Sequence, residues 1–93
     1  MDRIEIDSNA FEGYSIPTQK ASLLAIRGKR GMLACAYLKV ETADKIGDAL
    51  AIVTGVSSHS DMLEKPVVAV SRAAERLGVK IGMNGRDALL KMA

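Results

Sequence analysis

Residues 31–56 constrain the fold of this chain more than any other segment. Two apolar runs, residues 32–38 and 49–54, flank a short polar segment with helical signals. Apolar side chains occupy both alternating faces of the first run, a pattern typical of a strand that is covered on both sides of its sheet. We therefore expect two neighbouring buried strands, joined by a short helix, with the rest of the chain packed around them.

The segment between the two runs predicts a short helix. Thr42 is a candidate N-cap, and Gly47 is a suitable C-terminal stop. Glu41 and Lys45 are spaced four residues apart, which favours the helix further. A strand, a helix and a second buried strand predict a right-handed crossover with the strands parallel, although this connection is shorter than the roughly twelve residues usually needed.

The first part of the chain predicts two strands and a turn. Residues 3–7 alternate polar and apolar side chains, as a strand with one solvated face does. Residues 8–13 supply turn chemistry, and residues 14–16 resume an extended pattern that Pro17 confines to a strand end or an edge. Because these two strands contain few apolar residues, they need a partner surface, either the rest of the domain or another subunit.

A second hairpin follows directly. Residues 20–27 predict a third strand, and the glycine-flanked residues 28–31 predict a tight turn into the strand at residues 32–38. Arg27, Lys29 and Arg30, with Lys20 nearby, form the only basic cluster of the chain. At a hairpin tip such charges keep an edge unpaired more often than they bind a ligand.

The region after the second buried strand predicts helices. Ser58 or Ser60 would cap a short helix over residues 61–64. Pro66 suits the first turn of a longer helix that continues to Leu77 and ends at Gly78, and we favour this interpretation.

Two further features belong to this region. The apolar residues 67–70 also fit a strand, in which case the helix begins at Ser71. Asn84 then provides a cap-like start for a final helix that buries Ala88, Leu89 and Met92.

Together these elements predict an α+β fold. The sheet is mixed, with about five strands from an N-terminal hairpin, a second hairpin and one parallel crossover, and three to four short helices pack on it. The 93 residues form a single domain, with N-terminal strands in residues 1–18 and an α+β core in residues 19–93. With 48% hydrophobic residues and a mean hydropathy of +0.11, so short a chain has more apolar surface than a monomer readily buries, and we expect self-association.

Charge and cysteine usage exclude several classes of protein. The 13 Lys and Arg residues are interspersed with 11 Asp and Glu residues, so no cationic arm can follow a phosphate backbone and nucleic acid is not the expected partner. Cys35 has no partner for an intrachain disulfide, which suits a reducing compartment. No apolar run approaches the roughly 18 residues of a membrane span, and the first residues lack the apolar core of a signal peptide. We expect a cytoplasmic protein with no membrane segment.

Three blocks of sequence resemble a known family. They are GKRGMLACAYLKVETADKIGDALAIVTGV, SDMLEKPVVAVSRAAERLGV and GMNGRDALLKM. In this order they are similar to the YunC-like domain-of-unknown-function family of bacteria and archaea (DUF1805), over about residues 13–92. The resemblance implies an α+β fold whose N-terminal β region, here residues 1–18, joins subunits into tetramers. It implies no activity and no catalytic residues.

Polar residues gather where the two predicted parallel strands end. The candidate ligand-binding residues are Glu41, Thr42, Thr54, Gly55, Ser57, Ser58, His59 and Asp61. Ligands of open α/β sheets bind outside the carboxyl ends of the strands, and free N–H groups at two helix starts favour a carboxylate or phosphate. We therefore expect a small anionic ligand here, although helix capping alone also explains Thr42, Ser58 and Ser60. The chain has neither a P-loop nor a G-x-G-x-x-G motif, so no cofactor is predicted.

Cys35 and His59 are the candidate catalytic side chains, since the chain has no other thiol or imidazole. The apolar neighbours of Cys35 favour a buried thiol that packs as a small hydrophobe. His59, with Asp61 two residues on, is more typical of an exposed loop than of an acid–base site. One His and one carboxylate are too few for a zinc site, so no metal is predicted.

These observations leave two functions from different classes and, as a weaker third, nucleic-acid binding through Lys20, Arg27, Lys29 and Arg30. The first is a homo-oligomeric, non-enzymatic module that binds a small anion at the ends of its central strands. The alternative is a small enzyme that uses Cys35, His59 or both, in a site completed across a subunit interface.

Overall fold

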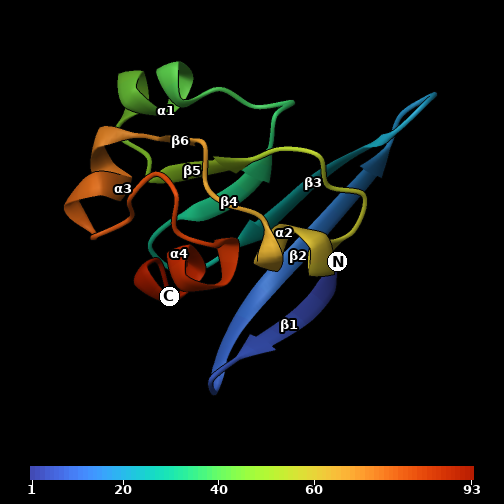
Figure 1. The fold of residues 1–93 in the computed structure, drawn as a ribbon, viewed down its shortest axis with the longest axis horizontal. Coiled ribbons are helices and arrows are strands. Elements are labelled where there is room, and N and C mark those ends of the chain that lie inside the picture. Colours follow the sequence, from blue (N-terminus) through green and yellow to red (C-terminus); the bar gives the residue numbers. More distant parts are fainter.

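A computed structural model describes residues 1–93 and contains one mixed sheet of six strands in sequence order (Figure 1). The strands are β1 (Asp2–Ile6), β2 (Asn9–Pro17), β3 (Ser22–Arg27), β4 (Met32–Cys35), β5 (Leu50–Val53) and β6 (Ala69–Val70). The helices are α1 (Val40–Ile46), α2 (His59–Glu64), α3 (Arg72–Arg76) and α4 (Gly85–Lys91). All neighbouring strands are antiparallel except β4 and β5, which are parallel. The predicted α+β class is confirmed, with one strand more than expected.

The two faces of the sheet differ in what covers them. One side, the covered face, packs against α2, α3 and α4 in a core of 16 buried residues that includes Phe11, Leu33 and Leu89. The opposite side, the open face, has only α1 on it, and its core is the five residues Ala25, Ala34, Ala43, Leu50 and Ile52. Both faces of β4 and β5 are therefore apolar and buried, as their sequence predicted.

The N-terminal hairpin differs from the sequence prediction in its turn. The turn is formed by Asp7 and Ser8, which have positive φ angles of 49° and 69°, rather than by residues 8–13. Two such residues match the right-handed twist of the flanking strands. Strand β2 consequently begins at Asn9, and its alternation brings Phe11 and Gly13 onto the covered face. The hairpin extends away from α1, at the lower end of the molecule in Figure 1.

The crossover from β4 to β5 is confirmed as parallel. Strand β4 ends at Cys35, three residues earlier than predicted, so the connection spans residues 36–49 and is longer than the sequence indicated, with α1 forming half of it. The predicted cap at Thr42 is wrong, because the N-cap is Lys39 and its side chain makes no capping hydrogen bond. Gly47 ends the helix with a φ of 84°, a conformation that glycine adopts without strain.

The preferred continuous helix over residues 66–77 is wrong, and the alternative is correct. Ala69 and Val70 form β6, which pairs with the free edge of β5. Val68 N donates to Ile52 O at 2.8 Å, and Ser71 N donates to Leu50 O at 2.9 Å. Pairing with an otherwise open strand edge therefore outweighs the helical pattern, and α3 begins only after Ser71.

The final helix forms as the sequence predicted. The Asn84 side chain accepts a hydrogen bond from Asp87 N at 2.8 Å, and Ala88, Leu89 and Met92 are fully buried. Its far end is held by Arg30 of the β3–β4 turn, whose Nη2 donates to Lys91 O at 2.9 Å and whose Nε donates to Ala93 O at 3.0 Å. None of the helices is long and apolar enough to cross a membrane.

Candidate functional site

The carboxyl ends of β4 and β5 border a shallow hollow of about 310 Å³. Its lining, which defines the strand-end hollow, consists of Ala21, Ser22, residues 35–37 and residues 54–56. Of the predicted ligand-binding residues only Thr54 and Gly55 line it. Ser22 and Tyr37 line it too, although the sequence did not point to either residue. They come from the start of β3 and from the turn after β4, which only the register of the folded sheet brings together.

Cys35 lies at this hollow but is nearly closed off from solvent. Its side chain belongs to the large core, and the residue is 7% exposed. The Leu24 backbone N–H donates to Cys35 Sγ at 3.3 Å. The prediction of a buried thiol that packs as a hydrophobe is confirmed, and its one polar contact is to the main chain.

Ser57, Ser58 and Asp61 form hydrogen bonds with one another at the start of α2. Ser58 Oγ accepts from Asp61 N at 3.1 Å, which confirms the predicted cap. The Asp61 carboxylate accepts from Ser57 N at 3.0 Å and from Ser57 Oγ at 2.9 Å. The Ser57 N–H, followed by the Ser57 hydroxyl, holds the pKa of Asp61 below its ordinary 3.8. This end of the site therefore already contains an anion of its own.

His59 is not the exposed loop residue that the sequence favoured. It is the first residue of α2, and its side chain is 16% exposed. Its ring packs against Gly13, where an added Cβ would lie 2.9 Å from His59 Cε1. His59 Nε2 lies 3.0 Å from Tyr14 O, so the tautomer that carries the Nε2 proton donates to β2. Nδ1 lies 3.7 Å from an Asp2 carboxylate oxygen.

Cys35 and His59 are consequently not brought together as a nucleophile and base. Each has a different partner, the former on β3 and the latter on β2. No group of three or more His, Cys, Asp or Glu side chains is arranged to hold a metal ion. The structure thus presents no assembled pair for acid–base or thiol chemistry within one chain.

Thr42 lies apart from the strand-end residues, at a second and larger hollow. This turn–helix hollow has a volume of about 700 Å³ and is lined by residues 27–32, 37–39, 42, 43, 46 and 48–50. It lies between the β3–β4 turn and α1. Glu41, the residue before Thr42, is exposed on α1 and lines neither hollow. The single predicted crevice is therefore divided into two hollows that share Tyr37.

Comparisons with known proteins agree on the fold and on the lack of an assigned activity. Residues 34–92 match the family model described as a domain of unknown function, DUF1805. The uncharacterized protein YunC of Bacillus subtilis is 33% identical over 93 residues, which cover 96% of this chain and 92% of that protein. The crystal structure of a protein of unknown function from Thermoplasma acidophilum has a TM-score of 0.94 and 35% identity, covering 99% of this chain and 90% of that one.

Proposed function

This chain belongs to the DUF1805 family of domains of unknown function, and from that premise we propose that it is a homo-oligomeric, non-enzymatic binding module. Its N-terminal strands join subunits through the open face of the sheet. Its strand-end hollow takes a small anionic ligand. The two parts of this proposal are argued and tested separately below.

The proposal of self-association rests on the exposure of an inner strand. Strand β2 has β1 on one side and β3 on the other, yet nothing covers its open face. Ala10, Glu12, Tyr14 and Ile16 project there, and all four are exposed, with Ile16 at 59%. The other face of β2 buries Phe11 in the core, whereas the open face carries aliphatic and aromatic side chains in solvent.

The polar groups on this face favour a specific interface over non-specific adhesion. Tyr14 Oη donates to Glu12 Oε1 at 2.9 Å, and this hydrogen bond is the main cause of the raised pKa of Tyr14. Arg27 lies 3.9 Å from the same carboxylate. A second copy of the chain would thus meet an apolar strip with a fixed polar border, as subunit interfaces commonly have. A tetramer is the assembly that we propose.

The test is the mass in solution of the unchanged chain and of Ile16→Asp, measured by size-exclusion chromatography with light scattering. We expect an oligomer for the former and a species close to the 9.9 kDa chain for the latter. Ile81→Asp is the matched control, because Ile81 is 65% exposed and follows α3, outside the hairpin. Ile4 and Ile6 are unsuitable for this test, since Ile6 is buried and Ile4 packs against the same core.

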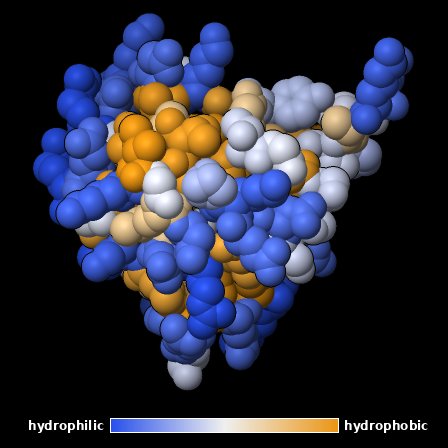
Figure 2. Space-filling model, in the orientation of Figure 1, coloured by the Kyte–Doolittle hydropathy of each residue, from blue (hydrophilic) through white to orange (hydrophobic).

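A monomeric unchanged chain at micromolar concentration would refute self-association. An oligomer that survives Ile16→Asp but dissociates with Ile81→Asp would place the interface around β6 instead. Figure 2 shows apolar surface gathered in that region, and Val68, which precedes β6, is 46% exposed. An unchanged mass in both variants would refute the role of β2.

The ligand proposal rests on the position of the strand-end hollow at the carboxyl ends of two parallel strands, where open sheets bind their ligands. Three residues of its lining carry hydroxyl groups, Ser22, Tyr37 and Thr54, and the Tyr37 hydroxyl already donates to Thr18 Oγ1 at 3.3 Å. Because no Lys or Arg is part of this lining, a bound anion would be held by hydroxyl groups and main-chain N–H groups. Native mass spectrometry of the purified protein tests this proposal. We expect a retained small molecule that is lost in Thr54→Val but kept in Thr42→Val, and equal retention in both variants would contradict the assignment.

The enzyme hypothesis keeps one supporting observation, the position of Cys35 at the strand-end hollow. A reactive thiolate would be alkylated by iodoacetamide in the native protein at a rate close to that of a free thiol. Because Cys35 is 7% exposed and accepts a main-chain hydrogen bond, we expect alkylation only after unfolding. Rapid native alkylation would favour the enzyme over the binding module. We also propose a cytoplasmic location, since Cys35 is the only cysteine and is free.

A further inference from the structure

The turn–helix hollow differs from the strand-end hollow in size, charge and lining. Its volume of about 700 Å³ is within the range of roughly 300–1,000 Å³ that is typical of small-molecule sites. It opens on the open face of the sheet, where the seven residues of α1 are too few to cover the strands beneath. It is therefore a separate feature of the fold.

The floor of this hollow is apolar. Met32 is half-buried, and Ala43 and Leu50 are buried. Ile46 stands at the end of α1 with 69% of its surface exposed, although it lines the same hollow. An apolar group placed in the hollow would contact Ile46 and Met32 together and remove both from water.

The rim of the hollow is positively charged. Arg27, Lys29 and Lys39 line it, and Asp48 is the only carboxylate in the lining. Lys29 and Lys39 take part in no ion pair. Arg30 also lines the hollow but is already engaged by the backbone oxygens of the C-terminal residues. An incoming anion would therefore meet cations that are not held by other partners.

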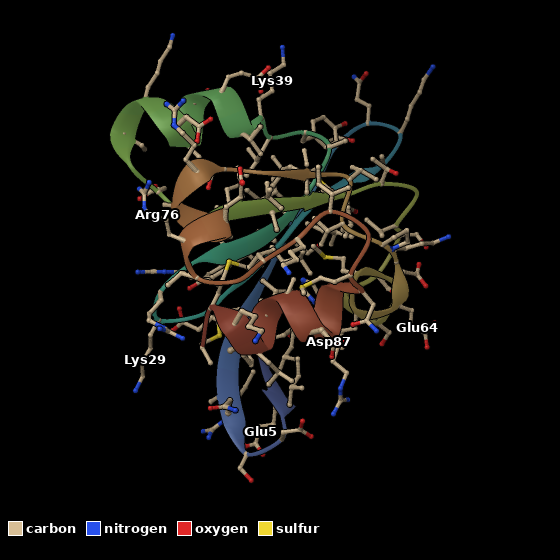
Figure 3. The ribbon with its side chains drawn as sticks, turned by 60° about the vertical axis from the view of Figure 1, so that its left-hand side comes forward. Glu5, Lys29, Lys39, Glu64, Arg76 and Asp87 are labelled. Carbon is tan, nitrogen blue, oxygen red and sulfur yellow. The ribbon has the colours of Figure 1, made fainter.

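Arg27 carries the one guanidinium of the lining that main-chain oxygens do not hold, and its planar fork matches the geometry of a carboxylate. It lies 3.9 Å from Glu12, too far for a strong bidentate pair. It also lines an adjoining hollow of about 480 Å³, together with Arg3 and Lys29. Lys39 lies at the α1 end, far from Lys29, and both side chains point outward in Figure 3. The cations thus do not form a continuous track for a nucleic-acid backbone, and the guanidinium of Arg27 is the natural anchor at one end.

We infer that the turn–helix hollow binds an amphipathic acid, a small molecule with one anionic group held by Arg27 and an apolar body lying on Met32, Leu50 and Ile46. This site is distinct from the strand-end hollow and does not depend on the proposed function. A free inorganic anion would leave the apolar floor unused, and a neutral apolar molecule would leave the cationic rim unused. Only a molecule with both parts uses the whole hollow.

The experiment is a titration of the full chain with octanoate, followed by amide chemical shifts, with octanamide and acetate as matched probes. We expect saturable octanoate shifts confined to residues 27–32 and α1, with a Kd at or below about 1 mM. Acetate lacks the apolar body and octanamide lacks the charge, so each should bind at least about tenfold more weakly.

Four variants assign the binding groups. Arg27→Gln should weaken octanoate binding about tenfold or more, whereas Arg76→Gln on α3 should not change it. Ile46→Asp should weaken it by a similar factor, whereas Ile81→Asp, at an equally exposed site outside the hollow, should not. The mass of each variant is measured as well, so that weaker binding through dissociation of subunits is recognised.

Three results would overturn the inference. The first is the absence of saturable shifts at the hollow. The second is equal affinity for octanoate and octanamide. The third is an affinity in Arg27→Gln that equals the affinity in Arg76→Gln at unchanged mass. Loss of the ligand retained at Thr54 has no bearing on these measurements, so the two sites fail or succeed independently.

Discussion

The covered and open faces of the same sheet are built from different side chains. On the covered face, Phe11, Ile26 and Leu33 pack against α2 and α4, and each is at most 1% exposed. The buried side chains of the open face are mostly small, with Ala25 and Ala34 at its centre. Large side chains under three helices make most of the core, whereas small ones under one short helix leave the turn–helix hollow and an exposed strand. The difference teaches that the side chains that stabilise the sheet gather mostly on one of its two sides.

The largest effect should come from the closest contact on the covered side. Gly85 begins α4, and a Cβ there would meet the Met62 carbonyl oxygen at the end of α2. Because both helices are packed on the sheet, neither can move aside, and Gly85→Ala should cost more than about 3 kcal/mol in the free energy of unfolding. Gly47→Ala on the open side, where nothing lies within 4 Å, should cost only about 1 kcal/mol despite its φ of 84°. Urea denaturation measures both, and similar costs would contradict the contrast between the faces.

A second prediction compares truncations of large side chains. Leu89 is fully buried on the covered face, so Leu89→Ala should lower the free energy of unfolding by about 2–5 kcal/mol. Ile46 borders the open face at 69% exposure, and Ile46→Ala should change it by no more than about 0.5 kcal/mol. Thermal and urea denaturation measure both variants. If Leu89→Ala and Ile46→Ala lost comparable amounts of unfolding free energy, the open face would contribute more to stability than its burial indicates.

A third prediction concerns Ser71, the only fully buried polar side chain. Its Oγ accepts from Leu50 N at 2.9 Å and donates to Asp48 O at 2.8 Å. Ser71→Ala leaves both main-chain groups without this partner, so we expect a loss of about 1–3 kcal/mol. Ser58→Ala removes an exposed cap of α2 and should cost about 1 kcal/mol or less. Equal losses of unfolding free energy in Ser71→Ala and Ser58→Ala would show that solvent replaces the Ser71 hydroxyl.

The smallest effect should be the pH dependence of Asp61. Its pKa in the folded state lies below the ordinary 3.8, because Ser57 hydrogen bonds favour the carboxylate. The stabilisation is therefore complete above that ordinary value and is lost as the pH falls through the folded-state pKa. Asp61→Asn should lower the melting temperature slightly at neutral pH, and the difference should vanish in acid. A difference that does not vary with pH would contradict this origin.

Local signals in the sequence were sufficient for much of the fold. The glycine-flanked turn at residues 28–31, the stop at Gly47 and the cap at Asn84 each depend on neighbouring residues alone, and each formed as predicted. The parallel pairing of β4 and β5 was also predictable, because strands that are apolar on both faces must be covered on both sides of the sheet.

The remaining features depend on contacts that the local sequence does not contain. The sequence favoured a helix over residues 67–70 and left a strand as the alternative, and pairing with the free edge of β5 decided for the strand. The turn at Asp7 and Ser8 lacks the glycine that marks most two-residue hairpin turns.

The candidate site was predicted less well than the fold. Of the residues that were predicted to bind a ligand, Thr54 and Gly55 line the hollow at the strand ends. The division into two hollows follows from the path of α1 back across the open face, which moves Thr42 to the far side of Tyr37. The sequence around Arg27 and Lys29 indicated only a charged turn, because most of the apolar floor beside it comes from α1 and β5, which lie later in the chain.

The hydrogen bonds between Arg30 and the end of α4 couple the local unfolding of two distant segments. The last turn of a helix normally frays independently of the rest of the domain. Here Arg30 N also donates to Met92 O at 3.0 Å, and Met92 is fully buried. Fraying of the last helical turn would therefore release the β3–β4 turn at the same time. In hydrogen exchange the amides of these two segments should open together, so that residues about sixty positions apart in the chain belong to one cooperative unit.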